Sequence, residues 1–345
     1  MTSKWLSLAT SSILGQAPRP NLLSKLLPKL LASLLISTLG QAPVIADSAM
    51  DWVQRMSNAM RNLNYRGDFV YMHDNRLEGM QISHYKDMNG EKERLLSLNG
   101  EAREVIRDNQ NLTCIWPSSR KVIVDVSRQN SFSPIFIPED IARLEKFYQM
   151  RLVGKDRVAK MEAVIVHIDP LDQYRYGMKF WINEDNGLMM RSNLLDENQR
   201  VVEEVMFTSL QLFEGDNKLV VDTMPPIDDS YTLVRYHSGD SSRTFAADNA
   251  WQLATVPGGF WRESVLRRKI SGSDQFIQQM VYTDGLASFS VFIEKKSDLT
   301  QSGVSSMGAV NAFIRILNDH SVTAIGEVPA ITVKQVAESV TYQRQ

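Results

Sequence analysis

The chain offers few side chains that could carry out catalysis. None of its five histidines stands in a closely spaced metal-binding pair; they are His73, His84, His167, His237 and His320. His167 and Asp169 lie two residues apart and share one face of a predicted strand, but a metal site needs three or four donors. The chain has neither a GxGxxG sequence nor a P-loop. We therefore expect no metal and no cofactor.

The serine and acidic residues give no catalytic set either. Residues 237–242 (HSGDSS) resemble part of a serine-protease segment, but the glycines that would follow and an assignable triad are missing. Glu203–Glu204 and Asp228–Asp229 are adjacent pairs, and adjacent residues of a strand point to opposite faces. They are therefore poor partners for acid–base chemistry. These observations predict a protein that is not an enzyme.

Cys114 is the only cysteine, so an intrachain disulfide cannot form. It alternates in phase with Leu112 and Trp116, which predicts a side chain that faces a core. A catalytic thiol would need a partnered histidine, for which the sequence gives no support.

Charge and an N-terminal segment narrow the class of protein. The 345 residues are enough for two domains. Residues 1–46 hold four basic and no acidic residues, which leaves 34 basic against 40 acidic, a net charge of about −6, in the remainder. That balance argues against general nucleic-acid binding. The apolar run 30–39, followed by small residues at Val44 and Ala46, predicts a signal peptide cleaved before Asp47.

The remaining segments predict mostly β structure. Apolar residues recur with helical spacing through 50–63, and strict alternation follows from Phe69. Turn signals recur about every ten residues through 212, which predicts one large antiparallel sheet of about ten strands. A second short helix is expected over 138–147. This region, 47–214, is expected to be one domain.

A change of composition, with two prolines and several acids, marks 215–231 as a linker. Residues 232–345 predict a smaller sheet-and-helix domain whose first strand is 233–237 and whose final helix runs from Pro329 to about Tyr342. Residues 297–307 are small and polar and are expected to form a loop. Residues 309–317 suit either a strand or a helix.

A wide sheet with only two short helices leaves its concave face exposed or shaped into a cleft for an apolar ligand. An ordinary packed core is the alternative for any single residue. The side chains expected to line a cleft are aromatic: Phe69, Tyr71, Trp116, Phe136 and Trp181.

A basic run in the smaller domain is the candidate for binding a partner. Its residues are Trp261, Arg262, Arg267 and Arg268. The pattern suits either a solvated strand face or docking onto an acidic peptide or an anionic lipid head group.

The chain resembles the MucB/RseB family of periplasmic regulators of sigma-E-type (AlgU-like) factors, and it is closer to the MucB branch. The residues that carry the resemblance are NYRGDFVY at 64–71, EKERLLSLNG at 91–100, YRYGMKFW at 174–181, YTDGLASFSV at 282–291 and GEVP at 326–329. The resemblance implies a half-barrel sheet with helices in its concavity, similar to LolA lipoprotein carriers, and a smaller antiparallel sheet-and-helix domain.

The resemblance also implies a function. Members of the family bind the periplasmic region of a transmembrane anti-sigma factor (MucA or RseA) and shield it from site-1 proteolysis until lipid or lipopolysaccharide releases them. Two other interpretations remain open: a periplasmic carrier of lipid or lipoprotein, and an enzyme acting on envelope lipids. The expected partners are the anti-sigma factor and lipid or lipopolysaccharide fragments, with no nucleic acid. Self-association is left open.

Overall fold

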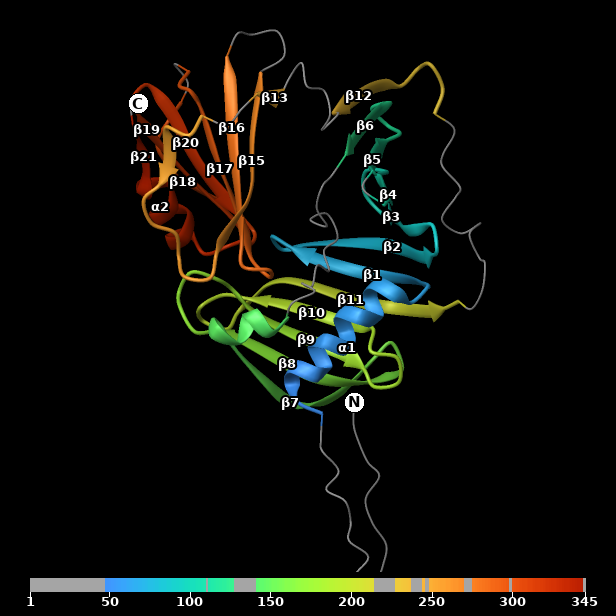
Figure 1. Ribbon diagram of the computed structural model, residues 1–345. Helices are drawn as coiled ribbons and strands as arrows, with labels where there is room; N and C mark the ends of the chain where they lie inside the picture. The colour runs from blue at the N-terminus through green and yellow to red at the C-terminus, as the bar shows by residue number, and fades with distance from the viewer. Residues whose placement is uncertain are drawn as a thin grey trace, which may run out of the picture. The chain divides into compact units, whose positions relative to one another are not determined.

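The computed structural model describes residues 47–109, 111–126, 141–213, 227–236, 244–245, 248–269, 275–297 and 300–343 (Figure 1). These residues form two larger sheets, each with a hydrophobic core of its own. The mostly β fold, with one large antiparallel sheet and one smaller sheet, is confirmed. No helix in the described ranges has the length and apolar character that crossing a bilayer requires.

The large sheet has twelve strands. Their spatial order is β12 (Thr232–Tyr236), β6 (Lys121–Val126), β5 (Asn111–Trp116), β4 (Glu104–Asp108), β3 (Gly90–Ser97), β2 (Arg76–Asp87), β1 (Tyr65–His73), β11 (Val201–Leu212), β10 (Met189–Leu195), β9 (Gly177–Asn183), β8 (Met161–Pro170) and β7 (Tyr148–Val158). Every neighbouring pair is antiparallel except β12 and β6. The predicted run of short antiparallel strands is therefore present.

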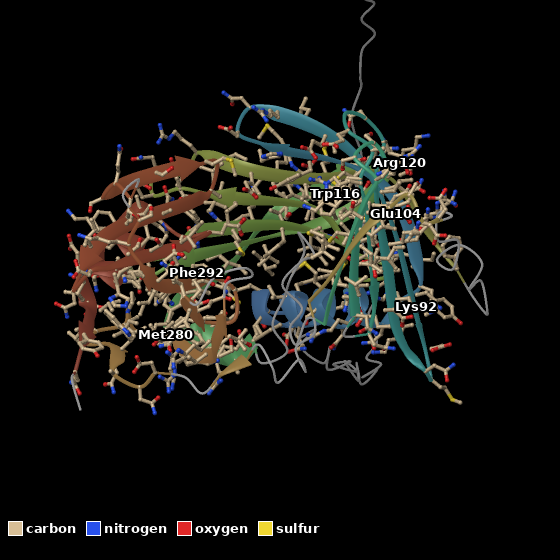
Figure 2. The ribbon with its side chains drawn as sticks, turned by 90° about the horizontal axis from the view of Figure 1, so that it is seen from above. Lys92, Glu104, Trp116, Arg120, Met280 and Phe292 are labelled. Atoms are coloured by element: carbon tan, nitrogen blue, oxygen red, sulfur yellow. The ribbon has the colours of Figure 1, made fainter. Side chains whose placement is uncertain are left out.

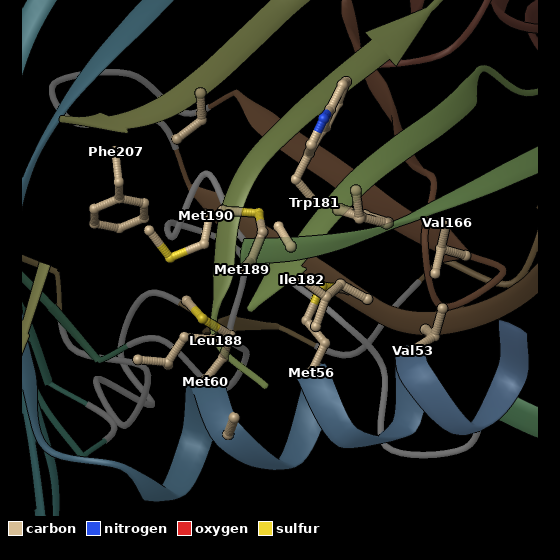
Figure 3. Packing of buried hydrophobic residues seen from close by; sticks show 14 of the residues in the cluster. Val53, Met56, Met60, Val166, Trp181, Ile182, Leu188, Met189, Met190 and Phe207 are labelled. Carbon is tan, nitrogen blue, oxygen red and sulfur yellow. The ribbon is translucent and has the colours of Figure 1, made fainter. Parts of the chain in front are cut away.

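Helix α1 (Ala49–Asn62) covers one part of this sheet. Its N-terminus is a capping box, in which the Asp51 amide donates to Ser48 Oγ at 3.1 Å and the Ser48 amide donates to Asp51 Oδ2 at 2.8 Å. Val53 and Met56 are fully buried, and Figure 3 shows them directed toward Val166 and Ile182. The predicted apolar stripe thus packs on strands β8 and β9.

One sequence expectation for this region is confirmed and one is wrong. The short helix expected over 138–147 is present as the 3-10 helix η1 (Ile141–Lys146), and residues 138–140 lie outside the described residues. The strand expected at 233–237 as the start of the smaller domain is β12, which pairs in parallel with β6 of the large sheet. Its alternating residues specify a strand but not the sheet edge that it joins.

The smaller sheet has seven strands, with α2 (Ala330–Ser339) packed on one face. The strand order is β13 (Thr244–Phe245), β15 (Trp261–Lys269), β16 (Phe276–Thr283), β17 (Ser288–Lys295), β20 (His320–Gly326), β19 (Val310–Leu317) and β18 (Gly303–Met307). A further pair joins β14 (Trp251–Leu253) to β21 (Val340–Tyr342).

Three outcomes follow for the smaller region. The ambiguous range 309–317 is a strand, β19, because it hydrogen-bonds to β20 along its length. The expected loop over 297–307 contains strand β18. The final helix ends at Ser339, earlier than expected, because the residues after it pair with β14.

Candidate functional site

The inner face of the large sheet, defined here as the face that α1 packs against, is the candidate ligand surface. Tyr71 pairs with Val205, Val205 with Ser192, and Ser192 with Phe180, so these four residues share that face. Phe180 and Val205 are buried in the same core cluster as α1. This part of the inner face is therefore a packed core.

The inner face continues beyond the strands that α1 covers. Gly67 on β1 pairs with Ile82 on β2. Following the paired residues from Ile82 through β3, β4, β5 and β6 identifies a row of apolar side chains on the same face. These side chains are half-buried, unlike the fully buried residues beneath α1; we call them the apolar strip, and they are Leu95, Val105, Cys114, Trp116 and Ile123. Sequence reasoning proposed only Trp116 of this set for the ligand site. The sequence signal for the other four residues was the alternation of side chains along these short strands.

Three of the predicted ligand residues share the inner face. Phe69 is buried and its ring centroid lies 5.5 Å from that of Phe207. The Tyr71 hydroxyl donates to Glu203 Oε2 at 2.9 Å. Trp116 lies at the end of β5 (Figure 2) and is half-buried. Only Trp116 lies in the apolar strip, whereas Phe69 and Tyr71 lie in or against the core beneath α1.

The other two predicted ligand residues are not brought to this surface. Trp181 follows Phe180 on β9, so it faces the opposite side of the sheet, and Figure 3 shows it directed away from α1. Its Nε1 donates to Asp156 Oδ2 at 3.0 Å, and the Arg191 guanidinium carbon lies 4.3 Å from its ring centroid. Phe136 lies outside the described residues.

An ion cluster occupies the inner face of β2 to β4, next to the apolar strip. Both ring nitrogens of His84 face acceptor oxygens, Leu63 O at 2.8 Å and Glu91 Oε1 at 3.0 Å. Arg107 donates to Glu93 Oε2 at 2.9 Å and also to Glu91. Burial by itself raises the pKa of Glu91, but the hydrogen bonds from His84 and Arg107 outweigh it and lower that pKa to about 2. The paired charges indicate a structural role.

The smaller sheet also has one face that α2 does not cover. Met280 and Val291 face α2 and are buried, so Phe292, the next residue after Val291, faces the other side (Figure 2). Half-buried apolar residues share that helix-free face: Leu266, Val281, Phe292, Ile314 and Ile325.

The predicted partner residues all lie on β15. Trp261 is 38% exposed, and the Arg143 guanidinium carbon lies 5.0 Å from its ring centroid. Arg262 is exposed, and the guanidinium carbon of Arg267 lies 4.5 Å from the ring centroid of Phe276. Arg268 pairs with Thr244 through the backbone; its side chain is outside the described part. Whether these residues bind a partner stays a prediction.

Contacts between the two sheets were not foreseen from the sequence. Arg175, in the β8–β9 loop, has a fully buried side chain, and its Nη1 lies 3.0 Å from Asp284 Oδ2 in the β16–β17 turn. The Tyr148 hydroxyl donates to the same oxygen at 2.8 Å. Nearby, Asn311 Nδ2 donates to the Tyr176 hydroxyl at 2.9 Å. The sequence signal at this contact is the Asp284–Gly285 pair, which is typical of a hairpin turn and does not indicate a distant partner.

Two acidic side chains, one from each sheet, also influence each other's charge. Glu327 follows β20 and keeps more than a third of its surface exposed. Burial of its carboxyl, and then the charge of Glu203 on β11, raise its pKa to about 7.

Among the described residues, no three histidine, cysteine or acidic residues are grouped so as to hold a metal ion.

Comparison with known proteins gives consistent matches over both sheets. Residues 48–229 match the MucB/RseB N-terminal domain, and residues 246–341 match the MucB/RseB C-terminal domain. The chain is 30% identical to the "Sigma factor AlgU regulatory protein MucB" of Pseudomonas aeruginosa, over 89% of the chain and 95% of that relative. It is 25% identical to the "Sigma-E factor regulatory protein RseB" of Haemophilus influenzae, over 90% and 96%.

A solved structure agrees with the fold. The structure described as the complex of Pseudomonas aeruginosa MucA and MucB aligns with a TM-score of 0.67 and 27% identity, over 86% of this chain and 99% of that one.

Proposed function

The chain belongs to the MucB/RseB family, and from that membership we propose that it is a periplasmic negative regulator of a sigma-E-type factor. It binds the periplasmic region of a transmembrane anti-sigma factor of the MucA/RseA type and shields that region from site-1 proteolysis. Like the named members of the family, it is a regulatory binding protein and not an enzyme.

One observation carries this proposal. Both family domains match in order, and the same body aligns with a relative that was solved together with MucA. Because the match includes the smaller sheet as well as the large one, it favours a regulator over a simple lipid carrier, which needs only a ligand surface. The sequence segment 1–46 supports export of the mature chain to the periplasm.

Lipid or lipopolysaccharide is the proposed release signal, and the apolar strip is its proposed site. Half-buried side chains in a row, such as Val105, Trp116 and Ile123, offer acyl chains an apolar surface without displacing α1. Release requires lipid to bind the partner-free conformation more tightly than the partner-bound one. The polar contacts between the sheets, including Arg175 with Asp284, are where the two conformations would differ.

The test is a reconstitution with residues 47–345 and the periplasmic region of the MucA-type protein. We expect a complex, slower cleavage of that region by a site-1 protease, and recovery of cleavage on addition of lipopolysaccharide. Bovine serum albumin is the control for general protection. A chain that binds lipid but neither binds nor protects the anti-sigma factor would indicate a carrier instead.

A further inference from the structure

Strand β18 forms one edge of the smaller sheet. It pairs with β19 over all five residues, and no strand in the described ranges lies on its other side. All five residues are exposed, including Val304 at 56% and Met307 at 69%. Its outer edge is therefore open to an added strand.

This edge is held in place at one end. Ser306 Oγ donates to Asn311 Oδ1 at 2.5 Å, and Asn311 Nδ2 donates to Val328 O at 2.8 Å. In the β18–β19 turn, a Cβ added to Gly308 would lie 3.7 Å from the Asp74 amide in the β1–β2 turn of the large sheet. The strand is thus positioned before any partner binds, and its turn lies beside the large sheet.

The two edges of this sheet differ in protection. Proteins usually guard an exposed edge with charges, prolines or bulges. Strand β15 has a bulge between Arg262 and Ser264, several basic residues, and a short covering strand, β13. Strand β18 (GVSSM) has no charge, no proline and no irregularity in its register. Its one protection is its length of five residues.

The turn geometry indicates which backbone groups face outward. Gly308 has φ of +59°, and the two-residue loop Gly308–Ala309 suits a type II′ turn, which closes on a hydrogen-bonded pair, here Met307 and Val310. Hydrogen-bonded and non-hydrogen-bonded pairs alternate along an antiparallel ladder. The N–H and C=O groups of Val304 and Ser306 therefore point to the open edge.

We propose that β18 binds an extended, uncharged segment of the anti-sigma factor as an added β-strand. This deepens the proposed function and rests on it. The side chains of an added strand would lie beside Val304 on one face and Met307 on the other, so apolar or small residues suit it better than charged ones. Because the β18–β19 turn lies beside the β1–β2 turn at Gly308, a shift of one sheet against the other would also move this edge.

A second copy of this chain fits less well. Two β18 strands paired about a twofold axis would contact each other over five residues each. A stable protein interface typically buries about 800 Å² per partner and about 20–30 residues a side. A partner that reaches other surfaces of the chain can supply that area, whereas the β18 edge alone cannot.

The decisive variant is Val304→Pro, with Val304→Thr as its matched control. Proline removes an outward-pointing N–H, which edge strands tolerate, and keeps the hydrogen bonds to β19, because Val304 and Phe313 form a non-hydrogen-bonded pair. Threonine keeps the N–H and the β-branched shape. We expect Val304→Pro to raise the Kd for the MucA-type periplasmic region at least tenfold by isothermal titration calorimetry, and Val304→Thr to change it less than threefold. Unchanged circular dichroism and Tm establish that both variants fold.

Hydrogen exchange on the wild-type complex gives an independent readout. The peptide covering 303–307 should exchange more slowly when the periplasmic region is bound, and not when the free chain is merely concentrated. Wild-type affinity in Val304→Pro, or no protection of this peptide, overturns the strand-addition proposal and leaves the proposed function standing. Protection that depends on chain concentration alone also overturns it, in favour of a second copy. Failure of the wild-type chain to bind overturns the proposed function itself.

Discussion

The Arg175 guanidinium and the Asp284 carboxylate lie 3.0 Å apart and join the large sheet to the smaller one. Both side chains are almost completely inaccessible to water, at 0% and 1% exposure. Asp284 Oδ1 also accepts the amides of Leu286 and Ala287, and Arg175 donates to the Gly258 carbonyl. The Nη1–Asp284 contact is a charge contact without hydrogen-bond alignment, since Nη1 has no aligned acceptor.

Arg175→Met should therefore uncouple the two sheets. Removing Arg175 leaves the Asp284 carboxylate buried without its opposite charge, with only the Tyr148 hydroxyl and two backbone amides still donating to it. Breaking a buried ion pair in this way costs about 3–5 kcal/mol. Because each sheet keeps its own core, we expect calorimetry to resolve two unfolding transitions where the wild-type chain shows one. Lys296→Met is the matched control, since its exposed pair with Asp319 should contribute less than about 1 kcal/mol. A single transition in Arg175→Met would show that other contacts couple the sheets.

Glu327 should make stability depend on pH near neutrality. Burial and the charge of Glu203 raise its folded-state pKa from 4.5 to about 7. A raised pKa means that the stabilising contribution is fully present below about pH 4.5 and is lost as the pH rises through 7. Between pH 5 and pH 8, the Tm of the wild-type chain should therefore fall relative to that of Glu327→Gln. Glu338→Gln, on an exposed position of α2, is the control and should not reproduce this difference.

Glu91 should make the stability of the fold depend on pH in the acidic range. Its pKa is lowered from 4.5 to about 2 by His84 and Arg107, which outweigh the effect of burial. Its contribution is present above about pH 4.5 and is lost as the pH falls through 2; the shift corresponds to up to about 3 kcal/mol. Urea denaturation between pH 6 and pH 2.5 should show a smaller loss of stability in Glu91→Gln than in the wild-type chain. Equal losses would mean that this carboxyl is not the group that titrates.

Helical spacing of apolar residues predicted α1, and their alternation predicted the antiparallel strands, because each pattern depends only on residues close in sequence. The face of the sheet on which each side chain lies was harder to predict. Phe180, Trp181 and Ile182 are three consecutive apolar residues, so the sequence gives no alternation from which to place Trp181; pairing with β10 is needed. Likewise, Arg175 and Asp284 lie 109 positions apart in the sequence, and no local pattern connects them.

Trp116 and Trp181 provide a matched test of the apolar strip. Both are tryptophans of the large sheet, but only Trp116 is on the inner face and half-buried. Brominated phospholipid should quench fluorescence of the wild-type chain, and the quenched component should be lost in Trp116→Phe and kept in Trp181→Phe. If Trp181→Phe removes the quenching instead, the ligand surface lies on the opposite face of the sheet.

The basic run on β15 gives the last prediction. In the described part of the chain, neither Arg262 nor Arg267 forms a salt bridge, so an acidic segment of a partner could pair with them without breaking an existing ion pair. Arg267→Glu combined with Arg268→Glu should weaken binding of the anti-sigma factor at least tenfold, about 1.4 kcal/mol. Lys295→Glu combined with Lys334→Glu, both at exposed positions, makes the same change in net charge and is the control.

The salt dependence of binding distinguishes docking on the β15 arginines from strand addition at the β18 edge. Binding through the arginines should weaken as ionic strength rises, because exposed charges are screened, whereas backbone pairing at β18 should change little. The Val304→Pro and Arg267→Glu/Arg268→Glu variants should therefore differ in salt dependence, with the arginine variant showing the smaller slope. Unchanged affinity in a folded Arg267→Glu/Arg268→Glu chain would remove β15 as a docking surface and leave the β18 edge as the candidate.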